Sequence, residues 1–188
     1  IITPGHPADI DQSPVLLWKF KAGGSLVGSP VIADSLVFIG STDSTLYALD
    51  MITGKQRWRL PTGGPIRSSV CLAPERLYLL SGDGLLYRIT RDSGFVDGLF
   101  RTINSYMGER QNDYADYYHS TPVLGDTALY FGAGGIVYSL SLTDGLINWS
   151  YKTGDVIHSS PVISNKRLYV SSFDGHVYAF DIRTGNLV

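Results

Sequence analysis

The stretch Ala48-Leu49-Asp50-Met51-Ile52-Thr53-Gly54-Lys55-Gln56-Arg57-Trp58 joins a small residue, a turn that closes on glycine and a tryptophan. The apolar residues before the turn are typical of a strand, and glycine suits the tight turn that sends a chain back antiparallel. A later stretch, Ala179-Phe180-Asp181-Ile182-Arg183-Thr184-Gly185, has the same Ala, Asp and Thr-Gly pair at the same spacing. The first stretch is therefore one copy of an internal repeat.

Four copies of this ending lie along the chain, each with a tyrosine in a strand-like run and a glycine that closes the turn. The position four residues after that glycine holds Trp58, Gly98 and Trp149, and Trp18 fits the same position of a preceding unit. The units are about 40 residues long, and the third carries about eleven extra residues. The four endings are residues 46–50, 86–90, 137–141 and 177–181.

Within each unit, short apolar runs alternate with turns that are rich in Asp and Gly, and no stretch indicates a helix of useful length. Four short strands per unit of about 40 residues are typical of a propeller blade. The sequence therefore predicts an all-β protein, a β-propeller of four-stranded antiparallel blades with four repeats. The predicted limits are a leader at 1–14, a propeller domain at 15–188 with repeats near 18–57, 58–97, 98–148 and 149–188, and an insertion near 101–118.

The pattern Ala-x-Asp-x-x-Thr-Gly-Lys-x-x-Trp, from Ala48 to Trp58, resembles the tryptophan-docking motif of the quinoprotein-type (pyrroloquinoline-quinone-like) β-propeller repeat family. The resemblance covers about residues 15–188. It implies that each tryptophan packs on the small Ala position of the neighbouring blade. The second repeat departs from the motif, with Arg88 for Ala and Gly98 for Trp. We expect Arg88 to fill the space that the indole leaves, and blade two to have the weakest outer edge.

The two ends of the chain match each other. Val15–Phe20 reads as an outer strand with no blade before it, and the last repeat stops before its own outer strand. Three arrangements follow: a closed four-bladed ring, half of an eight-bladed ring that a second copy completes as a homodimer, or a fragment of a longer propeller. The family resemblance implies seven or eight blades, which favours the last two.

Composition excludes some classes of function. The formal net charge of −2 argues against a general nucleic-acid binder, which needs a basic surface. No apolar run approaches the ~18 residues of a membrane span, and the start of the sequence has no signal-peptide pattern. The single cysteine, Cys71, excludes an internal disulfide. Because Cys71 aligns with Val31, Val123 and Val162, we expect a core residue.

In the family that the chain resembles, the innermost strand begins near a Ser-Ser-Pro-Val segment. The position before this segment holds Val27, Arg67, His119 and His158, and in a propeller such equivalent positions meet at one end of the central channel. A ring of these side chains with Ser68, Ser120 and Ser159 would suit an anionic or carbonyl-bearing small molecule. The insertion enters on the same face and offers a partner-binding loop. Its candidate contact residues are Tyr106, Arg110, Asp113, Tyr114 and Tyr117.

The residues of two further kinds of site are partly present. His119, His158 and Asp113 or Asp116 are suitable zinc ligands, but their spacing is not diagnostic, so no metal site is predicted. The resemblance also suggests part of a quinone-dependent dehydrogenase, whose cofactor stacks between a tryptophan and a disulfide of adjacent cysteines. One cysteine, three tryptophans already assigned to the repeat, and no match to the family's calcium ligands count against that cofactor.

These observations favour a non-catalytic binding module over an enzyme, with no cofactor. Two functions remain open: sensing a small molecule at the central channel, or scaffolding a protein partner through loops on one propeller face. The resemblance to outer-membrane assembly scaffold lipoproteins and to extracytoplasmic sensor domains implies a periplasmic or cell-surface location. The quinone-dependent dehydrogenase is the alternative.

Overall fold

The computed structural model describes residues 15–102 and 120–188, which form strands, turns and loops without a helix. Blade one consists of β1 (Val31–Ala33), β2 (Leu36–Ser41), β3 (Thr45–Asp50) and β4 (Gln56–Pro61). Blade two consists of β5 (Cys71–Ala73), β6 (Arg76–Leu80), β7 (Leu85–Thr90) and β8 (Val96–Arg101). Blade three consists of β9 (Val123–Leu124), β10 (Ala128–Ala133), β11 (Ile136–Ser141) and β12 (Ile147–Lys152). Blade four consists of β13 (Val162–Ser164), β14 (Arg167–Ser171) and β15 (Val177–Asp181).

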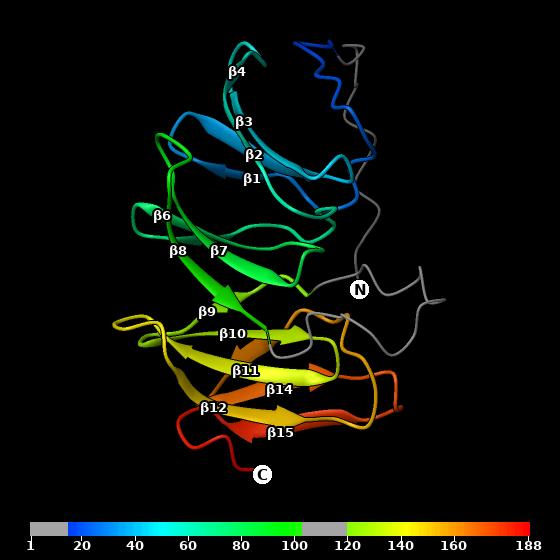
Figure 1. The fold of residues 1–188 in the computed structure, drawn as a ribbon, viewed down its shortest axis with the longest axis vertical. Coiled ribbons are helices and arrows are strands. Elements are labelled where there is room, and N and C mark those ends of the chain that lie inside the picture. The colour runs from blue at the N-terminus through cyan, green and yellow to red at the C-terminus, as the bar shows by residue number, and fades with distance from the viewer. Residues whose placement is uncertain (1–14, 103–119) are drawn as a thin grey trace, which may run out of the picture.

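Each sheet is antiparallel with its strands in sequence order, and the sheets follow one another along the molecule. Figure 1 shows blade one at the top and blade four at the bottom, with blades two and three between them. The predicted all-β, propeller-type fold is confirmed. Blades one and four lie at opposite ends of an open array. The leader and residues 103–118 of the insertion lie outside the described residues.

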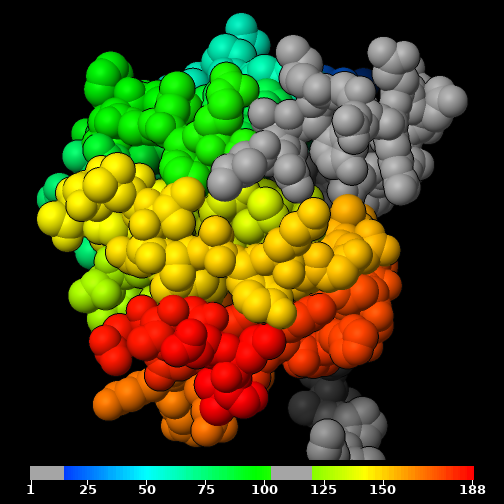
Figure 2. All heavy atoms as spheres, turned by 60° about the horizontal axis from the view of Figure 1, so that its bottom comes forward, coloured from blue at the N-terminus to red at the C-terminus, as the bar shows by residue number. Residues whose placement is uncertain are grey.

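The core lies between the sheets rather than inside any one of them, because each short sheet has two faces to cover. One cluster joins blades one and two around Phe38, Leu46 and Leu77. A second joins blades two and three, and a third joins blades three and four. Figure 2 shows the same order at the surface, where green, yellow and red bands succeed one another. The alternation of short apolar runs thus gives one apolar layer per blade boundary.

An aspartate in the turn after the second strand ties three blades to the segment before them. In blade two, Asp83 accepts hydrogen bonds from the Tyr87 hydroxyl, at 2.5 Å, and from the Gly63 backbone N–H, at 2.8 Å. Asp43 makes the same bonds with Tyr47 and Gly23, and Asp174 makes them with Tyr178 and Gly154. Blade three has Gly134 at this position and lacks the tie. The tyrosine that marks each repeat therefore bonds to a turn aspartate in blades one, two and four.

The three tryptophans make equivalent contacts with a turn that closes on glycine. The indole N–H of Trp58 donates to the carbonyl of Arg91 at 3.0 Å, and a Cβ on Gly94 would lie 2.7 Å from the ring. Gly94 has φ +72°, so glycine is needed both for the backbone and for the space. The same two contacts recur for Trp18 with Met51 and Gly54, and for Trp149 with Ile182 and Gly185.

Two expectations differ from the structure in detail. Ala48 is the register partner of Trp58 in the same sheet, so the small residue lies in the tryptophan's own blade and the glycine lies in the next. The prediction of a strand at Val15–Phe20 is wrong for the described residues, where this segment has no ladder partner. A strand needs a neighbouring strand to pair with. Instead, Trp18 and Phe20 pack on blade one beside Val37.

Candidate functional site

The serines of the predicted channel ring bond to the backbone of their own blades. The Ser68 hydroxyl donates to the Leu80 carbonyl at 3.0 Å. The Ser120 hydroxyl donates to the Gly132 carbonyl at 2.9 Å and accepts from the Gly132 N–H at 2.7 Å. Ser159 makes the same pair of bonds with Ser171. These hydroxyls fix the start of the innermost strand against the second strand of each blade.

The next residue along each segment links one blade to the next. The backbone N–H of Ser29 donates to the Ser69 hydroxyl at 2.9 Å, which connects blades one and two. The Ser69 N–H donates to Thr121 at 3.0 Å, and the Thr121 N–H donates to Ser160 at 3.1 Å. The Ser-Ser pair therefore has two structural duties, one within its blade and one across the blade boundary.

Arg67 and His158 both lie directly before these serines and are partly buried. Arg67 belongs to the start of blade two and His158 to the start of blade four, where its ring meets Phe173 edge to face at 4.5 Å between centroids. His119, Tyr106, Arg110, Asp113, Tyr114 and Tyr117 lie outside the described residues, as does Asp116. The ring of Arg67, His119 and His158 therefore stays a prediction.

Among residues 15–102 and 120–188, no cluster of His, Cys, Asp and Glu is suited to a metal ion. The same residues contain no helix that is long and apolar enough to cross a membrane. Cys71 is buried against blade three, and burial raises the pKa of its thiol to about 11. The side chain is a neutral core residue at physiological pH, where the thiolate is scarce.

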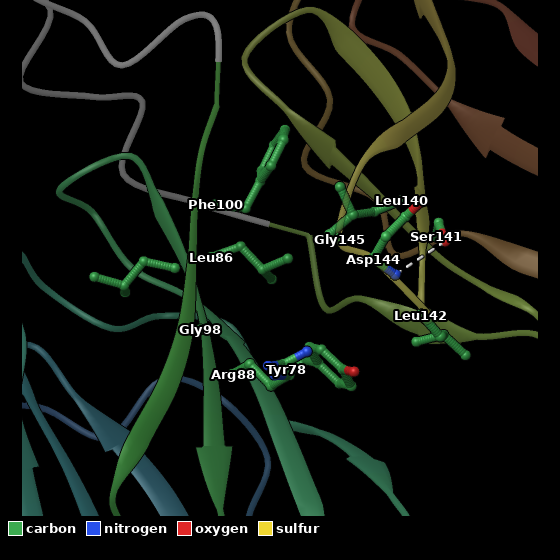
Figure 3. Close-up of a pocket in the computed structure, with 11 residues that line it drawn as sticks. Tyr78, Leu86, Arg88, Gly98, Phe100, Leu140, Ser141, Leu142, Asp144 and Gly145 are labelled. Atoms are coloured by element: carbon green, nitrogen blue, oxygen red, sulfur yellow. Dashed lines mark hydrogen bonds between the residues drawn. The ribbon is translucent and has the colours of Figure 1, made fainter.

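A cavity of about 170 Å³ lies between blades two and three. Figure 3 shows Tyr78 and Arg88 on one side and the turn of Leu142 to Gly145 on the other, with Phe100 above them. The cavity is the counterpart of the tryptophan slots, because Gly98 takes the place that Trp58 has in blade one. A Cβ on Gly145 would meet no atom within 4 Å, whereas Gly94 is covered by an indole ring.

The expectation that Arg88 fills this slot holds for the part over Gly98, where a Cβ would lie 3.0 Å from the Arg88 Nε, but not for the rest. Its guanidinium group turns to Asp97, with Nε 2.9 Å from Oδ1 and a second bond from a terminal nitrogen to the Asp97 carbonyl. Arg76 binds the other carboxylate oxygen at 2.6 Å. Partial burial disfavours the charge on Asp97, but the two guanidinium groups outweigh burial and keep its pKa below the usual value. The ion pairs hold Arg88 over Gly98 and leave the far part of the slot open.

The slot also has a polar end. The carbonyl of Leu142 corresponds to the carbonyls of Met51, Arg91 and Ile182 that accept an indole N–H, and it accepts no hydrogen bond from any described residue. Asp144 lies at the exposed rim, and the Ser141 hydroxyl bonded to its carboxyl lowers the pKa, so this group is an anion at neutral pH. Sequence reasoning noticed Gly98 but missed the contribution of Leu142, Asp144 and Gly145.

Comparisons with known proteins give consistent relatives. The chain is 26% identical over 167 residues to the sensor for unfolded proteins in the ER, ire1, from Schizosaccharomyces pombe, covering 84% of this chain and 14% of that protein. It is 23% identical over 175 residues to the outer membrane protein assembly factor BamB from Shewanella oneidensis, covering 90% of this chain and 44% of that protein. The chain thus spans less than half the length of these curated relatives.

Among solved structures, BamB from Moraxella catarrhalis superposes with a TM-score of 0.74 at 22% identity, over 90% of this chain and 54% of that one. This likeness supports the fold. The model of the family described as outer membrane protein assembly factor BamB matches residues 9–188. On that match, which takes in all four repeats, the chain belongs to the BamB family of quinoprotein-type propeller repeats.

Proposed function

We propose that this chain is a non-catalytic, extracytoplasmic scaffold that binds protein partners through loops on one face of its propeller. The observation that carries the proposal is the family match over residues 9–188 to a factor named for the assembly of outer membrane proteins. The extracytoplasmic location is inferred from the same name. A propeller suits such a role because its blades hold loops rigidly on a common face.

The bonding of the inner ring supports a scaffold more than a ligand pocket. The hydroxyls of Ser68, Ser120 and Ser159 bond to backbone groups, which fixes strand starts and leaves fewer groups to recognise a small molecule. The proposed contact surface is therefore the insertion near 101–118, with Arg110, Asp113 and Tyr114 as its central residues. Aromatic and arginine side chains of this kind often dominate the energy of protein interfaces.

The test is site-specific photo-cross-linking in the source organism, with a photoreactive phenylalanine at position 114. We expect a discrete cross-linked protein partner, whose yield falls at least tenfold in the R110A/D113A variant. A photoreactive residue at exposed Phe95, on blade two, is the matched control and should give no such product. Cross-linking that is absent, or unaffected by R110A/D113A, would overturn the proposal.

A small molecule at the channel mouth is the second candidate, and it rests on the equivalent positions of Arg67, His119 and His158. Replacing all three with Ala should abolish small-molecule binding and leave the melting temperature within a few degrees of the wild type. If the triple variant instead loses the cross-linked partner while the R110A/D113A variant keeps it, the protein interface lies at the channel mouth rather than on the insertion.

We also infer that a second copy of this chain covers the two end faces of the array. Val177 on blade four is 73% exposed, whereas Leu46, Leu86 and Val137 at the same position of the other blades are at most 2% exposed. At the other end Leu26 is 46% exposed, while its counterpart Ile66 is fully buried. Light scattering should give twice the 20.5 kDa mass of one chain, and a monomer would contradict the inference.

A further inference from the structure

We infer that the open slot between blades two and three is a binding site for the tryptophan side chain of a partner polypeptide. The inference rests on the proposed scaffold function for the source of that side chain, but its chemistry comes from the slot itself. Each of the other slots described above holds an indole ring in the same geometry. The open slot keeps the receiving groups, and no indole of the described residues lies against its Gly145.

The receiving groups are a bare glycine and a carbonyl. Gly145 has φ +72° and an uncovered Cα, so the flat face of a ring has room against the turn. The Leu142 carbonyl stands where Arg91 accepts the N–H of Trp58. A planar aromatic group with one N–H donor satisfies both features, and among side chains indole is the one that combines them with this size.

The volume and the walls fit such a ring. Apolar cavities of about 150 Å³ hold a benzene-sized ring, and the slot has about 170 Å³. Leu86, Phe100 and Leu140 supply apolar wall atoms. The Arg88 guanidinium is fixed by Asp97 and offers a cation to one face of an aromatic ring. At the rim, the Asp144 carboxylate favours a Lys or Arg beside the partner's tryptophan.

Trp18 shows that such a slot accepts an indole from a segment outside the sheet that receives it. Its segment has no ladder partner among the described residues, yet its N–H donates to Met51 at 3.0 Å, the same distance as for Trp58 and Arg91. Docking of the ring therefore does not require that the tryptophan belong to a paired strand. A short peptide that presents one tryptophan is enough to make the contacts.

The experiment is an NMR titration of the whole chain with N-acetyltryptophanamide as the probe. We expect the amide signals of Gly98, Leu142 and Gly145 to shift saturably. N-acetylphenylalaninamide has no N–H donor on its ring and should bind about fivefold more weakly. A peptide with one Trp next to Lys should bind more tightly than the amide alone, and its Trp→Ala version should not bind.

The matched variants fill the slot or leave it alone. R88A/G98W restores the small-residue and tryptophan pair of the other blades, and it should abolish probe binding. Arg88 must be replaced as well, because a Cβ on Gly98 would lie 3.0 Å from its Nε. F95W adds an indole at an exposed site outside the slot and should leave binding unchanged. If R88A/G98W fails to fold, R88A/G98L tests the same point, with at least a threefold loss expected.

No saturable shift, or shifts that persist in the slot-filling variants, would overturn the inference. Its failure is distinguishable from failure of the proposed function. Probe binding without any cross-linked partner at position 114 would contradict the scaffold proposal and support tryptophan binding in the slot. A cross-linked partner without probe binding would do the reverse.

Discussion

Trp58 joins two blades through a single side chain, so its replacement measures how much one slot contributes to stability. The ring packs beside Phe38 and against Gly94 and donates to Arg91. W58A should lower the free energy of unfolding by about 3 kcal/mol, because it loses buried area and leaves a cavity. Urea denaturation measures the change. W58F keeps most of the packing and should cost less than half as much, and equal losses for both variants would mean that packing is not the source.

Tyr87 contributes to the pH dependence of the folding stability in the alkaline range. Burial, followed by the hydrogen bond to the Asp83 carboxylate, raises the pKa of Tyr87 to about 12. Because the folded pKa lies above the unfolded value of about 10, the contribution to stability is complete below pH 10 and is lost as the pH rises toward 12. Urea midpoints at pH 9 and pH 11 should therefore fall less in Y87F than in the wild type. An equal fall in both proteins would rule out Tyr87 as a source.

In the open slot, the sequence reveals the residue changes but not the orientation of the Arg88 side chain. The change from Trp to Gly98 and from Ala to Arg88 is plain in the repeat. The outcome depended on where Arg88 turns, and that depends on Asp97 and Arg76, which meet only after β6, β7 and β8 have paired. The volume of the Arg88 side chain alone suggested a filled slot, whereas the ion pairs with Asp97 hold this side chain at one side of the slot.

At the scale of the elements, each aspartate tie connects a turn of its blade with the segment that precedes the blade. Asp174 accepts from Tyr178, His176 and Gly154, and the hydroxyl of Tyr178 is the main cause of a pKa held well below the usual value. D174A should therefore speed hydrogen exchange at the Gly154 amide by at least tenfold. Y178F keeps the bond to Gly154 and should change the rate much less. Unchanged exchange in D174A would show that the tie does not hold the segment.

Blade three differs from the other blades in this hydrogen bonding. Blade three has Gly134 where the other blades have the tying aspartate, and the segment that would be tied belongs to the insertion before it. The sequence contains both features separately, a glycine at position 134 and the extra length of the third unit. Their connection needed the hydrogen bonds of Asp43, Asp83 and Asp174, because spacing alone does not reveal which residue ties a loop.

At the scale of the whole molecule, the proposed assembly of two copies rests on the exposed side chains of the two end faces. Val177 and Leu26 lie at opposite ends and are exposed where their counterparts are buried. V177D should convert an assembled species to a 20.5 kDa monomer, because a charge on that face opposes burial. Light scattering on a sizing column measures the mass. Arg57→Asp on the exposed outer strand is the control and should keep the wild-type mass, and a V177D variant that stays assembled would remove blade four from the contact.

The architecture was predictable from the repeat, because a tyrosine and a turn-closing glycine recur in all four units and a tryptophan in three of them. This pattern indicates the number and order of the blades. Closure was not. The strand expected at Val15–Phe20 has no ladder partner within residues 15–102 and 120–188, and whether such a segment becomes a strand depends on which blade lies beside it. The local sequence determines the strands of each blade, whereas closure of a ring depends on which blade lies next to the end of the array.

The hydrogen bonds between Ser29, Ser69, Thr121 and Ser160 all run in one direction, each blade donating its amide to the hydroxyl of the next. The two ends of the array therefore differ: the series begins at blade one, where the Ser29 hydroxyl is the acceptor position, and ends at blade four, where the Ser160 amide is the donor position. Copies joined in this way meet head to tail in a heterologous contact, which either closes or continues without limit. Closure of the proposed two-copy ring would prevent unlimited growth, because the same bonds in an open geometry would build a filament.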